Sequence, residues 1–130
     1  MLFRSAVETV FKIHRFWGYV SIVANGLAGL YCLAAWRWHS LRGKPVWIVT
    51  IAAEIAVLVQ IALGVALVIG DKGYAAVPRF HMFYGAVIFL TVGLMYAYRR
   101  EMRGRLEMLY GLGGLFLMGL GIRAVLQVAA

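Results

Sequence analysis

Four long apolar segments dominate this chain, and they restrict its fold more than any other feature. A helix needs about 20 apolar residues to cross the hydrocarbon core of a bilayer. Backbone polar groups in lipid must be paired within the chain, so each segment is expected to be a helix. The sequence therefore predicts four membrane-spanning helices, which run from about Ile13 to Trp36, Val46 to Gly70, Phe80 to Tyr98 and Leu106 to Val128.

The composition supports a membrane protein. Of the 130 residues, 64 % are hydrophobic and 14 % are charged, with a mean hydropathy of +0.86. Soluble domains are nearer half apolar and a quarter charged. A chain of this length supplies one domain, residues 1–130. The net charge of +8 is not a signal for nucleic-acid binding, because the Lys and Arg residues cluster between the apolar segments, as in helical membrane proteins.

Short connections join the segments and determine the expected topology. They cover residues 37–45, 71–79 and 99–105. Short links place consecutive helices antiparallel, so we expect an all-α, up-down-up-down four-helix bundle. Residues 1–12 mix charged and apolar side chains and are expected to form an amphipathic lead-in at the membrane surface rather than a cleavable signal peptide.

The distribution of basic residues gives an expected orientation. Seven of the 13 Lys and Arg residues lie in the 37–45 and 99–105 connections, and six lie elsewhere. Cytoplasmic loops usually have the excess of Lys and Arg. We therefore expect these two connections inside the cell and the opposite end of the bundle at the outer face, with a bacterial plasma membrane as the location.

One nine-residue pattern occurs twice, near the start of the first and third segments. Residues 12–20 and 79–87 both read basic, apolar, His, any, Phe, large aromatic, Gly, any, Val. Both segments run in the same direction, so His14 and His81 are expected at the same depth, related by a pseudo-twofold axis along the membrane normal.

The helix faces that contain these histidines are expected to point inward. In a membrane helix, small and polar residues face protein rather than lipid. At 100° per residue, the His14 face is small and polar: Gly18, Ser21, Asn25 and Cys32. The His81 face is apolar and aromatic: Tyr84, Gly85, Ile88, Val92 and Met95.

Two imidazoles at matching depth on parallel helices can coordinate one metal ion, and we expect His14 and His81 to hold the iron of haem b. Two alternatives are a His that binds a lipid headgroup and a His bonded to a neighbouring carbonyl. Zinc is disfavoured, because a tetrahedral site needs more ligands than this face offers. His39, in the first connection, is expected to be a solvated loop residue.

A glycine follows each of the two histidines by four residues, and two interpretations stay open for this pair. Gly18 and Gly85 can leave room for a porphyrin close to the helix, or they can serve close packing between helices. The fourth segment is expected to use its glycines for packing, at Gly111, Gly114 and Gly121.

Polar residues near the His pair extend the expected site. Lys12, Arg15 and Arg79 are suited to the propionates of haem, and equally to lipid phosphates. Gln60 shares a helix face with Gly64 and is expected to line the cofactor cavity.

A carboxyl in a membrane helix is usually functional or buried against a partner. Glu54 lies in the same segment as Gln60 but points to a different side. We expect it to meet another subunit, a quinone or a proton path.

Three of these motifs resemble half of a haem A synthase, a bacterial and mitochondrial membrane family: His14-Arg15, the run from Gln60 to Gly64, and His81. The resemblance covers about residues 11–90 and implies a four-helix bundle with haem b between His14 and His81. The family's catalytic half has a Glu three residues before the first His and paired loop cysteines. This chain has Phe11 at that position and a single cysteine, Cys32, so it is more similar to the cofactor-holding half.

Together these features predict a membrane b-type cytochrome that moves electrons as a small subunit or accessory of a larger redox complex. Bis-His iron has no open coordination position, which favours electron transfer over oxygen chemistry. The expected partners are membrane lipid, other subunits and a quinone. Two alternatives stay open: a cofactor-free structural or assembly subunit whose glycine-rich fourth helix docks on a partner, and a haem-handling enzyme of the haem A synthase type.

Overall fold

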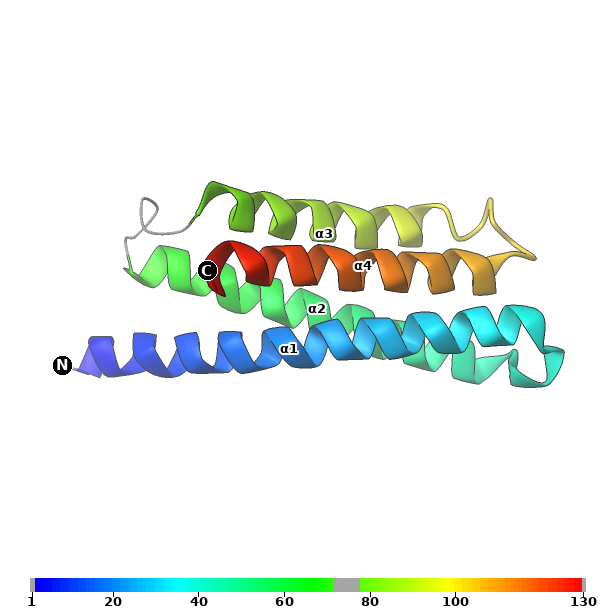
Figure 1. Ribbon diagram of the computed structural model, residues 1–130, viewed down its shortest axis with the longest axis horizontal. Coiled ribbons are helices and arrows are strands. Elements are labelled where there is room, and N and C mark those ends of the chain that lie inside the picture. The colour runs from blue at the N-terminus through cyan, green and yellow to red at the C-terminus, as the bar shows by residue number, and fades with distance from the viewer. Residues whose placement is uncertain (1, 72–77, 130) are drawn as a thin grey trace.

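The computed structural model describes residues 2–71 and 78–129 and shows an all-α bundle of four helices (Figure 1). Each of the four is long and apolar enough to cross a membrane. They lie side by side along one long axis (Figure 1). The helices are α1 (Leu2–Arg37), α2 (Lys44–Asp71), α3 (Arg79–Ala97) and α4 (Leu106–Ala129), with a short 3₁₀ helix, η1 (His39–Leu41), between α1 and α2.

The helix boundaries agree with the hydropathy pattern except at the N-terminus. α2, α3 and α4 begin and end within two residues of the expected positions. The expected start of the first helix near Ile13 was wrong, because α1 begins at Leu2. Residues 2–12 contain neither Gly nor Pro, the two residues that interrupt helices most strongly. His14 therefore lies well inside a helix of 36 residues, which rises over about 54 Å.

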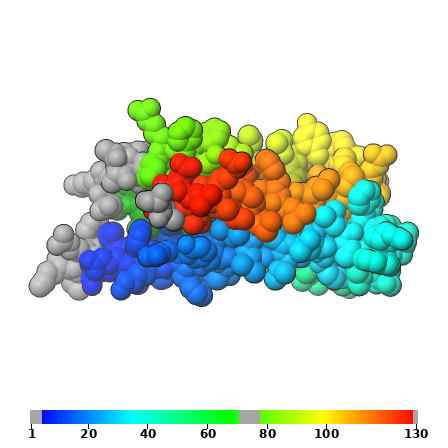
Figure 2. Space-filling view, in the orientation of Figure 1, coloured from blue at the N-terminus to red at the C-terminus, as the bar shows by residue number. Residues whose placement is uncertain are grey.

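Glycines bring α1 and α4 into close contact. A Cβ added to Gly114 would lie 2.9 Å from the carbonyl oxygen of Asn25 and 2.9 Å from the Cα of Gly29. Gly111 and Gly121 likewise receive the side chains of other α1 residues. These glycines serve packing, as the sequence predicts. In the space-filling view, α4 lies between α1 and α3 (Figure 2).

Polar side chains join α1 to α2. Trp17 Nε1 donates a hydrogen bond to the Ala56 carbonyl oxygen (2.7 Å), and Ser21 Oγ donates to the same oxygen (3.1 Å). Asn25 Nδ2 donates to the Ala53 carbonyl oxygen (3.2 Å). These bonds bury the small, polar face of α1 against its neighbour, which confirms that this face points into the protein.

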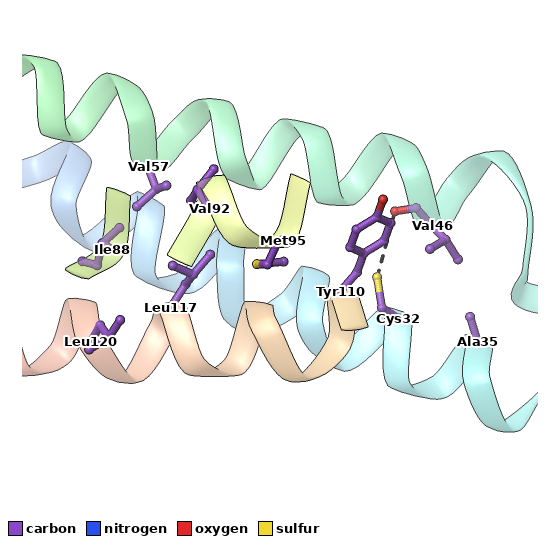
Figure 3. Packing of buried hydrophobic residues seen from close by; sticks show 10 residues of the cluster. All are labelled: Cys32, Ala35, Val46, Val57, Ile88, Val92, Met95, Tyr110, Leu117 and Leu120. Atoms are coloured by element: carbon purple, nitrogen blue, oxygen red, sulfur yellow. Dashed lines mark hydrogen bonds between the residues drawn. The ribbon is translucent and has the colours of Figure 1, made fainter. Parts of the chain in front are cut away.

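The apolar core lies mainly between α3, α4 and the parts of α1 and α2 that are nearer to η1. Ile88, Val92 and Met95 are buried in it, which confirms the predicted inward face of α3. Figure 3 shows Val92 of α3 beside Val57 of α2, with Leu117 and Leu120 of α4 in the same cluster. α3 packs mainly on α4 and has few contacts with α2.

Candidate cofactor site

The bundle brings the two predicted ligand residues together. The imidazole rings of His14 on α1 and His81 on α3 have centroids 6.3 Å apart, and their planes are inclined by 83°. Both rings are half-buried. Residues of all four helices surround the pair, so the site lies inside the bundle near the end where α3 begins.

His81 is oriented by α4. Its Nδ1 lies 2.8 Å from the carbonyl oxygen of Ala124. A carbonyl oxygen only accepts, so Nδ1 carries the proton of this hydrogen bond. In a neutral ring the lone pair is then on Nε2, the atom that is free to coordinate a metal. In many metal-binding histidines, a hydrogen bond from the ring nitrogen that does not bind the metal holds the ring in one tautomer and one orientation.

His14 is held by steric contact with α2. A Cβ added to Gly64 would lie 3.1 Å from the His14 Cε1, so this glycine lets α2 approach the imidazole ring. Within the described part of the chain, His14 Nδ1 and Gln60 Oε1 are buried without a hydrogen-bond partner. Buried polar atoms normally have partners, and unpaired ones often mark a site where an additional group binds.

The two glycines of the repeated pattern have different surroundings. A Cβ added to Gly18 would lie 2.8 Å from the Gln60 Nε2, so the space beside Gly18 is filled by the Gln60 amide. A Cβ added to Gly85 would meet no atom within 4 Å. Gly18 therefore serves packing against α2 in this structure, whereas Gly85 borders open space on the α3 side of the His pair.

The predicted basic residues lie around the site rather than in it. Lys12, Arg15 and Arg79 are all exposed, and so is Arg123, the residue before Ala124. Glu54 is not part of the site. It lies six residues before Gln60 on α2, at a different angle around the helix, and lines a groove between α2 and α3. His39 is exposed in η1, as predicted.

The donor set suits a metal that brings most of its own ligands. Among the described residues, no group of three or more His, Cys, Asp or Glu side chains is arranged to hold a metal ion. Imidazole nitrogen binds transition metals at about 2 Å, so two rings on opposite sides of one ion have centroids about 6 Å apart. The observed 6.3 Å agrees with that separation. Two imidazoles at this separation could bind a metal whose remaining ligands come from a bound group such as a porphyrin.

Sequence reasoning did not identify three of the groups that build this site. Ala124 contributes a backbone carbonyl, and no side-chain pattern reveals which carbonyl a histidine will meet. The contact of Gly64 with His14 depends on the relative position of two helices, although the Gln60–Gly64 spacing places both on one face. Trp17 holds α1 to α2 one turn from His14, and its indole nitrogen gives no pattern of its own.

Comparisons of this chain with protein-family models, with curated proteins and with solved structures find no match.

Proposed function

We propose that this protein is a membrane b-type cytochrome in which His14 and His81 hold the iron of one haem. The observation that carries the proposal is the 6.3 Å separation of the two imidazole centroids inside the bundle. Haem bound in this way supplies reversible one-electron chemistry. With His14 and His81 both holding the metal, the site would favour electron transfer over the binding of oxygen.

The surrounding residues have defined roles in this proposal. The Ala124 carbonyl holds the His81 ring in one tautomer, and Gly64 leaves the space that the His14 ring occupies. Gln60 offers an unpaired, buried amide oxygen one helical turn further along the bundle, where its side chain meets Gly18. Lys12, Arg15 and Arg79 supply positive charge at this end of the bundle, where haem propionates or lipid phosphates need it.

In this role the protein would be a small subunit or accessory of a larger membrane redox complex. Nearly all of its described residues lie in the four apolar helices, so the chemistry proposed here takes place within the membrane bundle. The Lys and Arg excess in the two loops opposite the His pair supports a haem near the outer face of a bacterial plasma membrane. The resemblance to the cofactor-holding half of haem A synthases supports the same assignment.

Specific residues bear on the two alternatives. For a haem-handling enzyme, the position three residues before His14 is Phe11, an exposed apolar side chain that cannot transfer a proton. For a structural subunit that docks through the glycines of α4, Gly111, Gly114 and Gly121 already pack against α1. That glycine face is therefore used within the chain and is not open to a partner.

Haem content of the purified protein tests the proposal. Protein produced with an adequate haem supply is expected to contain about one haem b per chain by pyridine haemochrome analysis. Its reduced-minus-oxidised spectrum is expected to have the sharp bands of a low-spin b-type cytochrome. Folded protein without haem under these conditions would refute the proposal.

A further inference from the structure

A groove between α2 and α3 has the form of a small-molecule site. Its volume is about 330 Å³. Sites for small ligands are concave and mostly apolar, with a few polar groups that fix the orientation of the ligand. Each helix contributes residues at i, i+3, i+4 and i+7, which is one face of a helix. The lining residues are Ile51, Glu54, Ile55 and Leu58 of α2, and Phe89, Val92, Gly93 and Tyr96 of α3.

Gly93 keeps this groove open. A Cβ added to Gly93 would meet no atom within 4 Å, so the glycine faces empty space rather than a neighbouring helix. It lies between the aromatic rings of Phe89 and Tyr96 on the same helical face. The ring of Tyr96 is itself covered by the guanidinium of Arg99, whose Cζ lies 3.8 Å from the ring centroid. The α3 side of the groove therefore has an aromatic residue at each end, Phe89 and Tyr96, with open space over Gly93 between them.

Glu54 is the acidic residue among those that line the groove. It lies about four residues from the middle of α2, or about 6 Å along the helix axis, and so deep within the expected hydrocarbon layer. No described residue donates a hydrogen bond to its carboxyl or forms an ion pair with it; the ion pair in the described part of the chain is Arg42–Glu107. A carboxyl at this depth is costly unless a donor meets it.

We propose that this groove binds a membrane-soluble hydroquinone, with a ring hydroxyl donating a hydrogen bond to the Glu54 carboxyl. An acyl chain would fill the apolar part but would leave Glu54 without a donor. A single ring fits between Phe89 and Tyr96 over Gly93, and an alkyl tail can leave the groove into lipid.

Equilibrium binding of a short-chain alkyl hydroquinone to the purified protein, kept reduced in nanodiscs, tests this inference. Calorimetry is expected to show saturable binding with one site per chain. Glu54→Leu removes the acceptor and Gly93→Leu fills the gap, and each is expected to weaken binding at least tenfold. The matched controls are Glu101→Leu, at an exposed loop carboxyl, and Gly119→Leu, at a glycine of α4 that also faces open space; both are expected to bind as the wild type does.

The far-UV circular dichroism spectrum of each variant reports folding whether or not haem is bound, which keeps this test separate from the proposed function. Loss of binding with an unchanged spectrum supports the site. If the protein has no haem but binds the hydroquinone in a Glu54-dependent way, the proposed function fails and the groove assignment stands. Equal binding by all variants, or uptake that does not saturate, would show partition into lipid only and would overturn the inference.

Discussion

His81 Nδ1 lies 2.8 Å from the carbonyl oxygen of Ala124, so a residue of α4 fixes the ring of a residue on α3. His14 has no equivalent bond within the described residues, and its ring is instead confined by the backbone of α2 at Gly64. The two histidines thus have matching sequence neighbours but different support. If both are axial ligands, His81 is the pre-oriented one and His14 is the one placed by packing.

Replacement of either histidine is expected to abolish the low-spin bis-His spectrum, because the iron loses a strong-field ligand. The variants are His14→Ala and His81→Ala, and visible absorption of the reduced protein is the measurement. His39→Ala is the control, since His39 is exposed in η1 at the opposite end of the bundle. A wild-type spectrum in either ligand variant would contradict the assignment of that histidine.

Gly85 allows cofactor binding to be separated from folding. Its added Cβ would meet no atom, so Gly85→Leu is expected to leave the packing of the bundle intact while it obstructs a porphyrin beside His81. Haem occupancy is expected to fall severalfold, with the thermal unfolding of the haem-free protein unchanged. Gly119→Leu, at another glycine with open surroundings, is the control. Full occupancy in Gly85→Leu would mean that the space beside Gly85 is not used by a cofactor.

The sequence allowed the number of helices and most of their inward faces to be predicted, because lipid imposes strong rules on backbone and side chains. Ser21 and Asn25 are buried against α2, and Val92 and Met95 are buried in the core, as their helical spacing indicates. The depth of His81 relative to His14 also followed from the repeated pattern and short connections. These features depend on hydropathy and periodicity, which are local in the sequence.

The remaining features depend on how helices sit against each other. Gly18 and Gly85 occupy equal positions in the repeated pattern, yet one meets Gln60 and the other meets open space. No property of either nine-residue copy distinguishes them. The start of α1 at Leu2 was missed for a different reason: hydropathy reports where lipid begins, whereas a helix continues until a residue interrupts it.

The contact between α1 and α4 predicts a sharp effect at Gly114. An added Cβ would lie 2.9 Å from backbone atoms of Asn25 and Gly29, and backbone cannot rotate away as a side chain does. Gly114→Ala is therefore expected to destabilise the fold by about 1–3 kcal/mol, the range for overpacked cores. Reversible unfolding in mixed micelles measures this. Gly119→Ala is the matched control. Equal free energies of unfolding of the two variants would show that the contact between α1 and α4 relaxes at little cost.

Arg42 links the end of α1 to the start of α4. Its Nε and Nη2 donate to the carbonyl oxygens of Ala35 (2.8 Å) and Trp36 (2.6 Å), near the end of α1, and Nε also lies 3.5 Å from the Glu107 Oε1. Arg42→Ala leaves those carbonyls without their donor and is expected to cost about 1–3 kcal/mol of the free energy of unfolding. Glu107→Gln removes only a partly exposed ion pair and is expected to cost less than about 1 kcal/mol. A larger loss of unfolding free energy in Glu107→Gln than in Arg42→Ala would contradict this prediction.

Single cysteines at the two ends of the bundle test the orientation. Ser40 and Glu101 are exposed in the two basic loops, and Thr9 is exposed on α1 beyond His14. Gly104 is a poor position for this purpose, because its φ of +92° strains any other residue. Cys32 is fully buried, so it can stay in place.

If the loops are cytoplasmic, an impermeant maleimide is expected to label Thr9→Cys in intact cells and to label Ser40→Cys and Glu101→Cys only after lysis. The reason is that Lys and Arg near membrane helices are retained on the cytoplasmic side. The reverse pattern would place the His pair, and any haem it holds, at the inner face. The wild type, treated in the same way, is expected to remain unlabelled and controls for reaction at Cys32.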